Sequence, residues 1–262
     1  MGKKQVNDKF YTKPEIAKMC TELLKLDDYD CVIEPSAGNG SFSNQIIHSN
    51  LISFDIEPEN SNIVKQDWLQ YSKYYKDRLL VCGNPPFGER NSLSKAFIKK
   101  SIEINAQTIA FILPNVYNKH TLQSIFPNNY RLKYVKELPK NSFILNNKEY
   151  HVPCSFYIWD KSNGLDLRFD IKKYKTEDFE FISKSKANDS VFFILGASPN
   201  TTKEISEVNK NNRGYYIQPK NKNKEELIRI FTNIKFKGMS SVNGGVSWLT
   251  KPEIIKNYLE RE

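Results

Sequence analysis

The 262-residue sequence has no hydrophobic run long enough to cross a membrane, and it has few cysteines and histidines. A membrane-spanning helix needs about 20 consecutive apolar residues, and the amino-terminal segment MGKKQVNDKF lacks the apolar stretch of a signal peptide. The four cysteines form no CxxC pair, and the three histidines have neither HExxH nor zinc-finger spacing. The sequence therefore predicts a protein with no membrane segment and no metal site, in a reducing intracellular compartment, cytoplasmic or nuclear.

Acidic residues are too few to balance the basic ones. Lys and Arg total 39 against 30 Asp and Glu, which gives a formal net charge of +9 and a pI near 9.1. Because such an excess attracts polyanions, nucleic acid is the first expected partner. Arg is scarce beside Lys, which suits contacts with phosphates more than bidentate contacts with bases. A Lys- and Asn-rich composition also fits AT-biased coding, so charge alone leaves the partner open.

Short apolar segments that alternate with amphipathic stretches indicate the fold. The predicted strands are 31–33, 51–54, 63–64, 79–82 and 109–113. The predicted helices are 41–48, 93–104 and one that starts at Thr12, the N-cap of a capping box with Glu15, and ends near Leu24. This alternation is typical of an α/β fold, a Rossmann-like, doubly wound, mainly parallel sheet. Segments 132–136 and 154–159 are expected to add an antiparallel pair at the edge of the sheet.

From about Lys161 the sequence becomes richer in Asn and Lys and its strand-like runs become shorter. Two such runs, 191–195 and 215–217, are separated by polar segments, and a second Thr-Lys-Pro-Glu at 250–253 is expected to open a last helix through Leu259. We therefore expect a first domain over residues 1–160 and a small α+β extension over 161–262. Nothing in the sequence sets an oligomeric state.

A loop with two glycines follows the first predicted strand, in the segment Glu34-Pro35-Ser36-Ala37-Gly38-Asn39-Gly40. The glycines allow a sharp turn and a close approach of the backbone to a ligand. Ser43 replaces the third glycine of the dinucleotide fingerprint GxGxxG, which argues against a pyrophosphate site and a nicotinamide dehydrogenase.

Acidic residues follow the next two predicted strands. Asp55, with Ile56 after it, ends the second strand, where a carboxylate can accept both hydroxyls of a ribose. Asp67, with Trp68 after it, follows the third strand and can accept a hydrogen bond from an exocyclic amine. The regular placement of these acids after successive strands favours a ligand site at one edge of the sheet.

The fourth strand leads into Asn84-Pro85-Pro86-Phe87. Two successive prolines restrict the backbone and remove two amide donors, so the turn is rigid. Such a turn can present the Asn84 side-chain oxygen and the Pro85 carbonyl as two convergent acceptors, which match the two N–H bonds of an exocyclic amine. Phe87 can offer a flat face to the ring of a base.

These motifs resemble those of class I S-adenosylmethionine-dependent methyltransferases, in particular the N6-adenine enzymes with an Asn-Pro-Pro-Phe motif. The resemblance covers about Phe10 to Asp160, and its motif order is similar to that of the γ-type DNA adenine enzymes. It implies S-adenosylmethionine as the cofactor, residues 1–160 as the catalytic domain and 161–262 as a substrate-recognition domain. The catalytic residues that it implies are Asn84, Pro85, Pro86 and Phe87. The cofactor contacts that it implies are Tyr11, Thr12, Pro14, Glu34, Ser36, Ala37, Gly38, Asn39, Gly40, Asp55, Ile56, Asp67, Trp68 and Asn84.

The resemblance also implies an aromatic residue that packs on the target base, from the loop between the last two strands. Phe143 is the first candidate and Tyr150 the alternate, beside Phe87. In the extension, cations mixed with aromatics are expected to contact the polynucleotide, with Arg213 and Lys220 as the named candidates.

The predicted function is methyl transfer to N6 of adenine in nucleic acid, with DNA favoured and RNA as an alternative. A protein glutamine amide has the same NH₂ geometry, but related enzymes with that substrate usually carry Tyr in place of Phe87. A catalytically inactive nucleic-acid-binding subunit is a third hypothesis, opposed by the intact motifs. Cytosine N4 methylation is disfavoured because that branch usually carries Ser in place of Asn84.

Overall fold

The computed structural model of the protein describes residues 10–170, 172–237 and 248–261, and in it the chain forms two compact units. The first unit ends at Phe169 and the second begins at Asp170. The segment 1–9, which makes up most of the amino-terminal stretch predicted not to be a signal peptide, lies outside the described residues. Within the described ranges, no helix is both long enough and apolar enough to cross a membrane.

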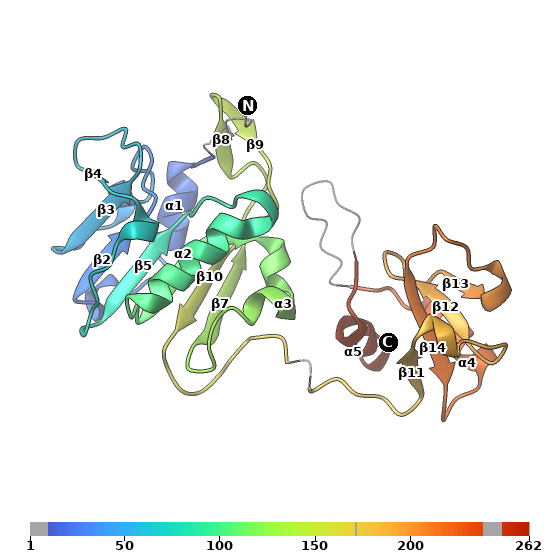
Figure 1. Ribbon diagram of the computed structural model, residues 1–262. Coiled ribbons are helices and arrows are strands. Elements are labelled where there is room, and N and C mark those ends of the chain that lie inside the picture. The colour runs from blue at the N-terminus through green and yellow to red at the C-terminus, as the bar shows by residue number, and fades with distance from the viewer. Residues whose placement is uncertain (1–9, 171, 238–247, 262) are drawn as a thin grey trace. The chain divides into compact units, whose positions relative to one another are not determined.

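A seven-stranded sheet with the order β4-β3-β2-β5-β6-β10-β7 forms the centre of the first unit (Figure 1). Its strands are β2 (Cys31–Glu34), β3 (Leu51–Asp55), β4 (Val64–Lys65), β5 (Leu79–Gly83), β6 (Thr108–Pro114), β7 (Arg131–Glu137) and β10 (Cys154–Asp160). The first five pair in parallel, and β10 is antiparallel to both of its neighbours, β6 and β7. The predicted Rossmann-like, mainly parallel sheet is confirmed. The antiparallel strand lies one position inside the edge because β7 pairs along its outer side.

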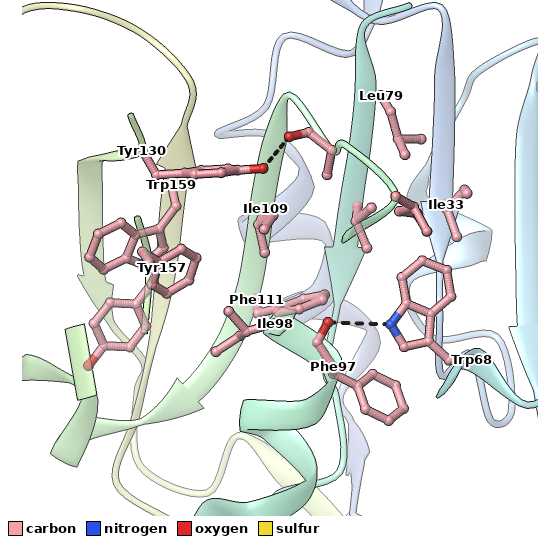
Figure 2. Close-up of a cluster of buried hydrophobic side chains, with 14 of the residues drawn as sticks. Ile33, Trp68, Leu79, Phe97, Ile98, Ile109, Phe111, Tyr130, Tyr157 and Trp159 are labelled. Carbon is pink, nitrogen blue, oxygen red and sulfur yellow. Dashed lines mark hydrogen bonds between the residues drawn. The ribbon is translucent and has the colours of Figure 1, made fainter. Parts of the chain in front are cut away.

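Helices cover both faces of this sheet, and each face has its own hydrophobic cluster. Alternate residues of a strand point to opposite faces. The cluster that includes helix α2 (Ser92–Glu103) contains Ile33, Val81, Ile98 and Phe111 (Figure 2). The cluster that includes helix α1 (Pro14–Thr21) contains Ala17, Val32, Leu80 and Ile112. The continuous apolar runs of the sequence are therefore strands that are buried on both sides.

The first unit has two smaller parts. A three-stranded sheet joins β1 (Tyr11–Thr12) to β8 (Phe143–Leu145) and β9 (Lys148–Tyr150), with antiparallel pairing throughout. The short helix α3 (His120–Gln123) lies between β6 and β7 in sequence. The pairing of β1 with β8 joins segments that are about 130 residues apart in the chain.

Over its described residues, the second unit is an antiparallel sheet with two helices. Its strands are β11 (Phe179–Ile182), β12 (Phe192–Leu195), β13 (Thr202–Glu204) and β14 (Gly214–Pro219), in the order β11-β14-β12-β13. Its helices are α4 (Lys224–Asn233) and α5 (Lys251–Leu259). Residues of both helices and of three strands share one hydrophobic core. This arrangement agrees with the predicted α+β extension.

Two local predictions are wrong. Segment 41–48 contains only a 3₁₀ turn at Ser43–Gln45, because the Asn39 side chain accepts from the amide and hydroxyl of Ser41 and competes with helical hydrogen bonds. Thr12 is not an N-cap: it lies in β1 opposite Phe143, and α1 starts after Lys13 without a side-chain cap.

The second Thr-Lys-Pro-Glu has the predicted structure. Thr250 precedes α5, and its capping box with Glu253 has both reciprocal hydrogen bonds. The Glu253 carboxylate accepts from the Thr250 amide at 2.6 Å. The same four residues therefore form a cap at one place and a strand end at the other, because β8 pairs only with the first copy.

We predict that Thr250→Ala destabilises the protein by about 1 kcal/mol. The reason is that the Glu253 amide, in the first turn of α5, loses the Thr250 hydroxyl as its acceptor. Thr250→Ser keeps the hydroxyl and should stay close to the parent. Urea unfolding followed by circular dichroism measures both. Equal stability of the alanine and serine variants would contradict the role of the capping box.

Candidate active site

The predicted site residues come from the carboxyl ends of neighbouring parallel strands. Glu34 ends β2, Asp55 ends β3, and Asn84 directly follows β5. Since β2 lies between β3 and β5 in the sheet, these ends lie at one edge. This is where ligands bind in open α/β sheets.

The glycine loop is fixed to β3. The Gly38 amide donates to the Asp55 carboxylate at 2.7 Å, and the Ala37 amide donates to the Phe54 carbonyl at 2.8 Å. Gly38 has φ = +53°, and a Cβ atom there would lie 3.2 Å from the Tyr11 ring. The loop therefore needs glycine at this position, both for its backbone conformation and for its contact with β1.

Two hydrogen bonds hold the Asn-Pro-Pro-Phe motif between the glycine loop and β1. The Ser36 hydroxyl donates to the Asn84 carbonyl at 3.1 Å. The Asn84 side-chain amide donates to the Phe10 carbonyl at 3.3 Å. This second bond leaves Asn84 Oδ1 buried and without a hydrogen-bond partner within the described part of the chain.

The rest of the motif forms a turn with one buried and one exposed proline. Pro85 is buried and Pro86 is exposed. Phe87 is partly buried against the cluster on the α1 side of the sheet, and its carbonyl accepts from the Ser94 amide at 3.3 Å. No described group donates to the Pro85 carbonyl. The turn therefore combines a fixed backbone with two acceptors, Asn84 Oδ1 and the Pro85 oxygen, that no described residue uses.

The amino-terminal strand contributes a second buried polar atom. Thr12 is 4% exposed, and its hydroxyl oxygen has no hydrogen-bond partner in the described residues. Tyr11 donates its hydroxyl to Glu59, which follows β3. Pro14 is exposed at the start of α1. Strand β1 thus brings the Thr12 hydroxyl, which has no described partner, and the Tyr11 ring, which is held by Glu59, to the glycine loop.

Glu34 is a buried carboxyl at the start of the glycine loop. It is 2% exposed, and Ser43 donates a hydrogen bond to it. Burial raises the pKa of Glu34 from 4.5 to about 7. Its Cγ atom would lie 3.2 Å from a Cβ atom at Gly83, the residue before Asn84. Glu34 therefore packs directly against the strand that carries the Asn-Pro-Pro-Phe motif.

Three of the predicted cofactor contacts differ in environment. Asp67 is exposed and accepts from the Leu69 amide at 2.9 Å, where it caps a 3₁₀ turn. Ile56 is 50% exposed. Trp68 is 1% exposed and lies in the α2-side core, where its indole nitrogen points to the Phe97 carbonyl at 3.4 Å (Figure 2). Trp68 is thus a core residue, while Asp67 and Ile56 remain available to a ligand. Of the other predicted cofactor contacts in the glycine loop, Asn39 is exposed and Gly40 is buried.

Of the two aromatic candidates for base contact, only Tyr150 has exposed surface. Phe143 is 0% exposed and belongs to the α1-side core, because β8 pairs with β1 and turns this side chain inward. Tyr150 is 45% exposed. Its ring centroid lies 5.1 Å from that of Phe10, whose carbonyl holds Asn84. Tyr150 therefore replaces Phe143 as the candidate.

The two predicted polynucleotide contacts lie in the second unit. Arg213 is exposed and donates to the Lys210 carbonyl at 3.4 Å. Lys220 forms an ion pair with Glu180 at 3.1 Å. A lysine whose charge is already paired with a carboxylate attracts a phosphate less than an unpaired one does. Lys220 and Arg213 are therefore not equivalent as candidate phosphate contacts.

Sequence reasoning missed Phe10, Ser43 and Glu59. Phe10 acts through its backbone carbonyl, which every residue has, so no sequence signal identifies it. Ser43 stands where the dinucleotide fingerprint has a glycine, and the pattern gives no sign that its hydroxyl donates to the buried Glu34 carboxyl. Glu59 lies in an exposed loop with no motif around it.

The strand order and the glycine loop define a Rossmann-like α/β fold with its candidate site at the carboxyl edge of the sheet. No protein-family model matches the sequence. The Arabidopsis thaliana protein named ENHANCED DOWNY MILDEW 2 is 27% identical over 180 residues, which cover 61% of this chain. The chain spans only 12% of the length of that relative.

Several solved structures are similar to part of this chain at low identity. The 23S rRNA methyltransferase ErmE has a TM-score of 0.48 and 14% identity, covering 63% of this chain and 75% of that one. A modification subunit of a putative type I restriction enzyme from Vibrio vulnificus has a TM-score of 0.46 and 14% identity, covering 60% and 46%. A putative RNA methyltransferase from Pyrococcus horikoshii has a TM-score of 0.43 and 16% identity, covering 56% and 81%. The fold assignment rests on the strand order of the sheet itself.

We predict that Glu34→Gln stabilises the protein at pH 8 and changes little at pH 5. The folded-state pKa of about 7 lies above the ordinary value of 4.5, so the folded protein binds this proton more tightly than the unfolded chain. The stability gained from this tighter proton binding is complete below pH 4.5 and is lost as the pH rises through 7. A pKa raised from 4.5 to about 7 corresponds to at most about 3 kcal/mol.

Urea unfolding of the parent and the variant at both pH values measures this difference. The exposed carboxyl of Glu89 gives a matched control, because Glu89→Gln makes the same chemical change without removing a buried group. A Glu34→Gln effect of the same size at pH 5 and pH 8 would contradict the buried, proton-binding state of Glu34.

Proposed function

We propose that the protein transfers a methyl group from S-adenosylmethionine to the N6 amine of adenine in nucleic acid, with DNA as the favoured substrate and RNA as the alternative. The observation that carries this proposal is the buried, unpartnered Asn84 Oδ1 in a rigid turn beside the glycine loop. A buried acceptor without a partner costs about 1–3 kcal/mol in the free protein. Such a cost is expected where a ligand later supplies the donor.

The residues around the glycine loop fit the proposed cofactor. Its ribose would meet the Asp55 carboxylate, its methionine part the glycine loop and the unsatisfied Thr12 hydroxyl, and its adenine Ile56 and Asp67. Each Asp55 oxygen already accepts one backbone amide, and a carboxylate oxygen has a further lone pair for a hydroxyl. When bound, S-adenosylmethionine supplies an electrophilic methyl group whose carbon–sulfur bond breaks as the new carbon–nitrogen bond forms.

The chain's own task is to position the adenine amine. Its lone pair is delocalised into the ring, which makes N6 a poor nucleophile. If Asn84 Oδ1 and the Pro85 carbonyl accept the two N6–H bonds, the nitrogen becomes more pyramidal and its lone pair points away from both acceptors. These acceptors also stabilise the positive charge that grows on N6. The extra proton leaves to solvent after transfer, so no dedicated base is required.

The exposed aromatic Tyr150 and the motif residue Phe87 would hold the ring of the base. A base in a duplex must first leave the stack, which costs a few kcal/mol. The net charge of +9 favours a polyanionic substrate over a protein side chain. The motif order, similar to that of γ-type DNA adenine enzymes, favours DNA.

We predict that Asn84→Ala lowers kcat by about 10²–10³-fold, the usual loss when one preorganised electrostatic partner is removed from a reacting group. Affinity for S-adenosylmethionine should change little, since the Asn84 side chain faces the acceptor amine. The assay uses labelled cofactor with mixed DNA and RNA oligonucleotides and identifies the product nucleoside by mass spectrometry.

The matched control is Asn128→Ala, at an exposed residue just before β7. It should keep parental activity. Full activity of Asn84→Ala would refute the mechanism, and label found in protein instead of N6-methyladenine would refute the substrate.

We also predict that Thr12→Val stabilises the free protein and weakens cofactor binding. The change removes a buried hydroxyl that has no partner, at nearly constant volume, which should gain about 1 kcal/mol. Loss of a contact with the cofactor should raise the dissociation constant by about 5–10-fold. Thermal unfolding and calorimetric titration measure the two effects.

Thr21→Val is the control, because the Thr21 hydroxyl already donates to the Lys18 carbonyl at 2.9 Å. It should neither stabilise the protein nor change cofactor affinity. A Thr12→Val protein that binds S-adenosylmethionine as the parent does would remove Thr12 from the proposed cofactor site.

A further inference from the structure

The sheet of the second unit has one face covered by its own helices. Phe192, Ile194 and Ile217 share the core with residues of α4 and α5. Glu204 of β13 forms an ion pair with Lys224 of α4 at 2.6 Å, which places it on the same side. Residues next to these in each strand point to the opposite face. We call that opposite side of the sheet the outer face.

A row of side chains crosses the outer face on all four strands. Residues directly opposite each other in antiparallel strands share a face, and the register aligns Lys203, Phe193, Tyr216 and Ile182. Phe193 is 2% exposed, and its ring lies edge-on to that of Tyr216 with centroids 5.0 Å apart. Tyr216 is partly exposed, and its hydroxyl makes no hydrogen bond to any residue the structure describes. Phe193 thus supports the ring of a tyrosine that is itself partly exposed.

Cations without acidic partners lie where β11 ends and β14 begins, at one end of the sheet. β11 ends at Ile182, opposite Tyr216, and Lys184 and Lys186 follow it. Arg213 directly precedes β14 at the same end. These three side chains and Lys203 form no ion pair with any described residue. Four other lysines of the second unit pair with carboxylates: Lys220 with Glu180, Lys222 with Glu226, Lys224 with Glu204 and Lys256 with Glu260.

We propose that the outer face binds a single-stranded segment of nucleic acid, with a base on the Tyr216 ring and phosphates near Lys203, Lys184 and Arg213. Aromatic rings beside uncompensated cations are the chemistry that binds single strands without sequence preference. A duplex keeps the faces of its bases inside the stack, so only an unpaired base can lie on the tyrosine. The inference rests on the proposed function, because the bound strand would belong to the nucleic-acid substrate. Binding of the strand to the outer face needs neither the cofactor nor Asn84.

Fluorescence anisotropy of the full chain, without cofactor, measures binding to labelled DNA and RNA single strands and to a duplex of the same DNA sequence. Tyr216→Ala should weaken single-strand binding about tenfold, since stacking on one aromatic ring contributes about this much. Tyr216→Phe keeps the ring and should bind as the parent does. Lys203→Gln with Arg213→Gln should lower the dependence of affinity on salt by about two phosphate contacts.

Lys222→Gln is the matched control, because this lysine is paired with Glu226 on α4, and it should leave binding unchanged. The surface pair Lys203→Gln and Arg213→Gln keeps the test valid if Tyr216→Ala fails to fold. Parental single-strand affinity in folded Tyr216→Ala, or an unchanged salt dependence in the double variant, would overturn the inference. Tighter binding of duplex than of single strands would overturn it as well.

The two proposals fail in different ways. Asn84→Ala removes a contact to the target base but no side chain of the outer face, so Tyr216→Ala should weaken strand binding by the same factor in the parent and in Asn84→Ala. Strand binding that depends on Tyr216 in a protein that never methylates adenine would contradict only the proposed function. Methylation with unchanged strand binding in Tyr216→Ala would contradict only the role of the outer face.

Discussion

The hydrogen bond from the Asn84 side-chain amide to the Phe10 carbonyl determines the chemistry that this site can perform. It commits the amide nitrogen to the backbone of the segment that leads into β1, so Oδ1 is left as a buried acceptor. The Ser36 hydroxyl fixes the Asn84 carbonyl from the other side, and Gly38 ties the same loop to Asp55. One chain of contacts thus connects β1, the glycine loop, β3 and the Asn-Pro-Pro-Phe turn.

Such a site stores unfavourable free energy in a well-packed domain. Unsatisfied acceptors and a buried carboxyl each oppose folding. Strands β2 and β5 are buried along their whole length, and α1 and α2 pack on opposite faces of the sheet that contains them. The burial of apolar side chains in this central layer stabilises the domain. This stabilisation offsets the cost of keeping the Glu34 carboxyl, the Thr12 hydroxyl and Asn84 Oδ1 buried.

The sequence was sufficient for the parallel sheet and for the edge at which the motifs meet, because buried strands are continuous apolar runs and their carboxyl ends share one side. It was insufficient where a distant partner decides the local structure. The two Thr-Lys-Pro-Glu copies differ because only the first pairs with β8. Phe143 was expected in a loop and lies in the core for the same reason. The anchor for Asn84 is a backbone carbonyl, which no side-chain pattern can reveal.

The most direct test of the central claim is a crystal structure of the protein with an adenine-containing oligonucleotide and an unreactive analogue of S-adenosylmethionine. We expect the distance from Asn84 Oδ1 to adenine N6 to be about 2.7–3.2 Å, with the amide nitrogen still on the Phe10 carbonyl. A structure in which Asn84 Oδ1 turns away from the bound base, or in which another group holds N6, would contradict the account.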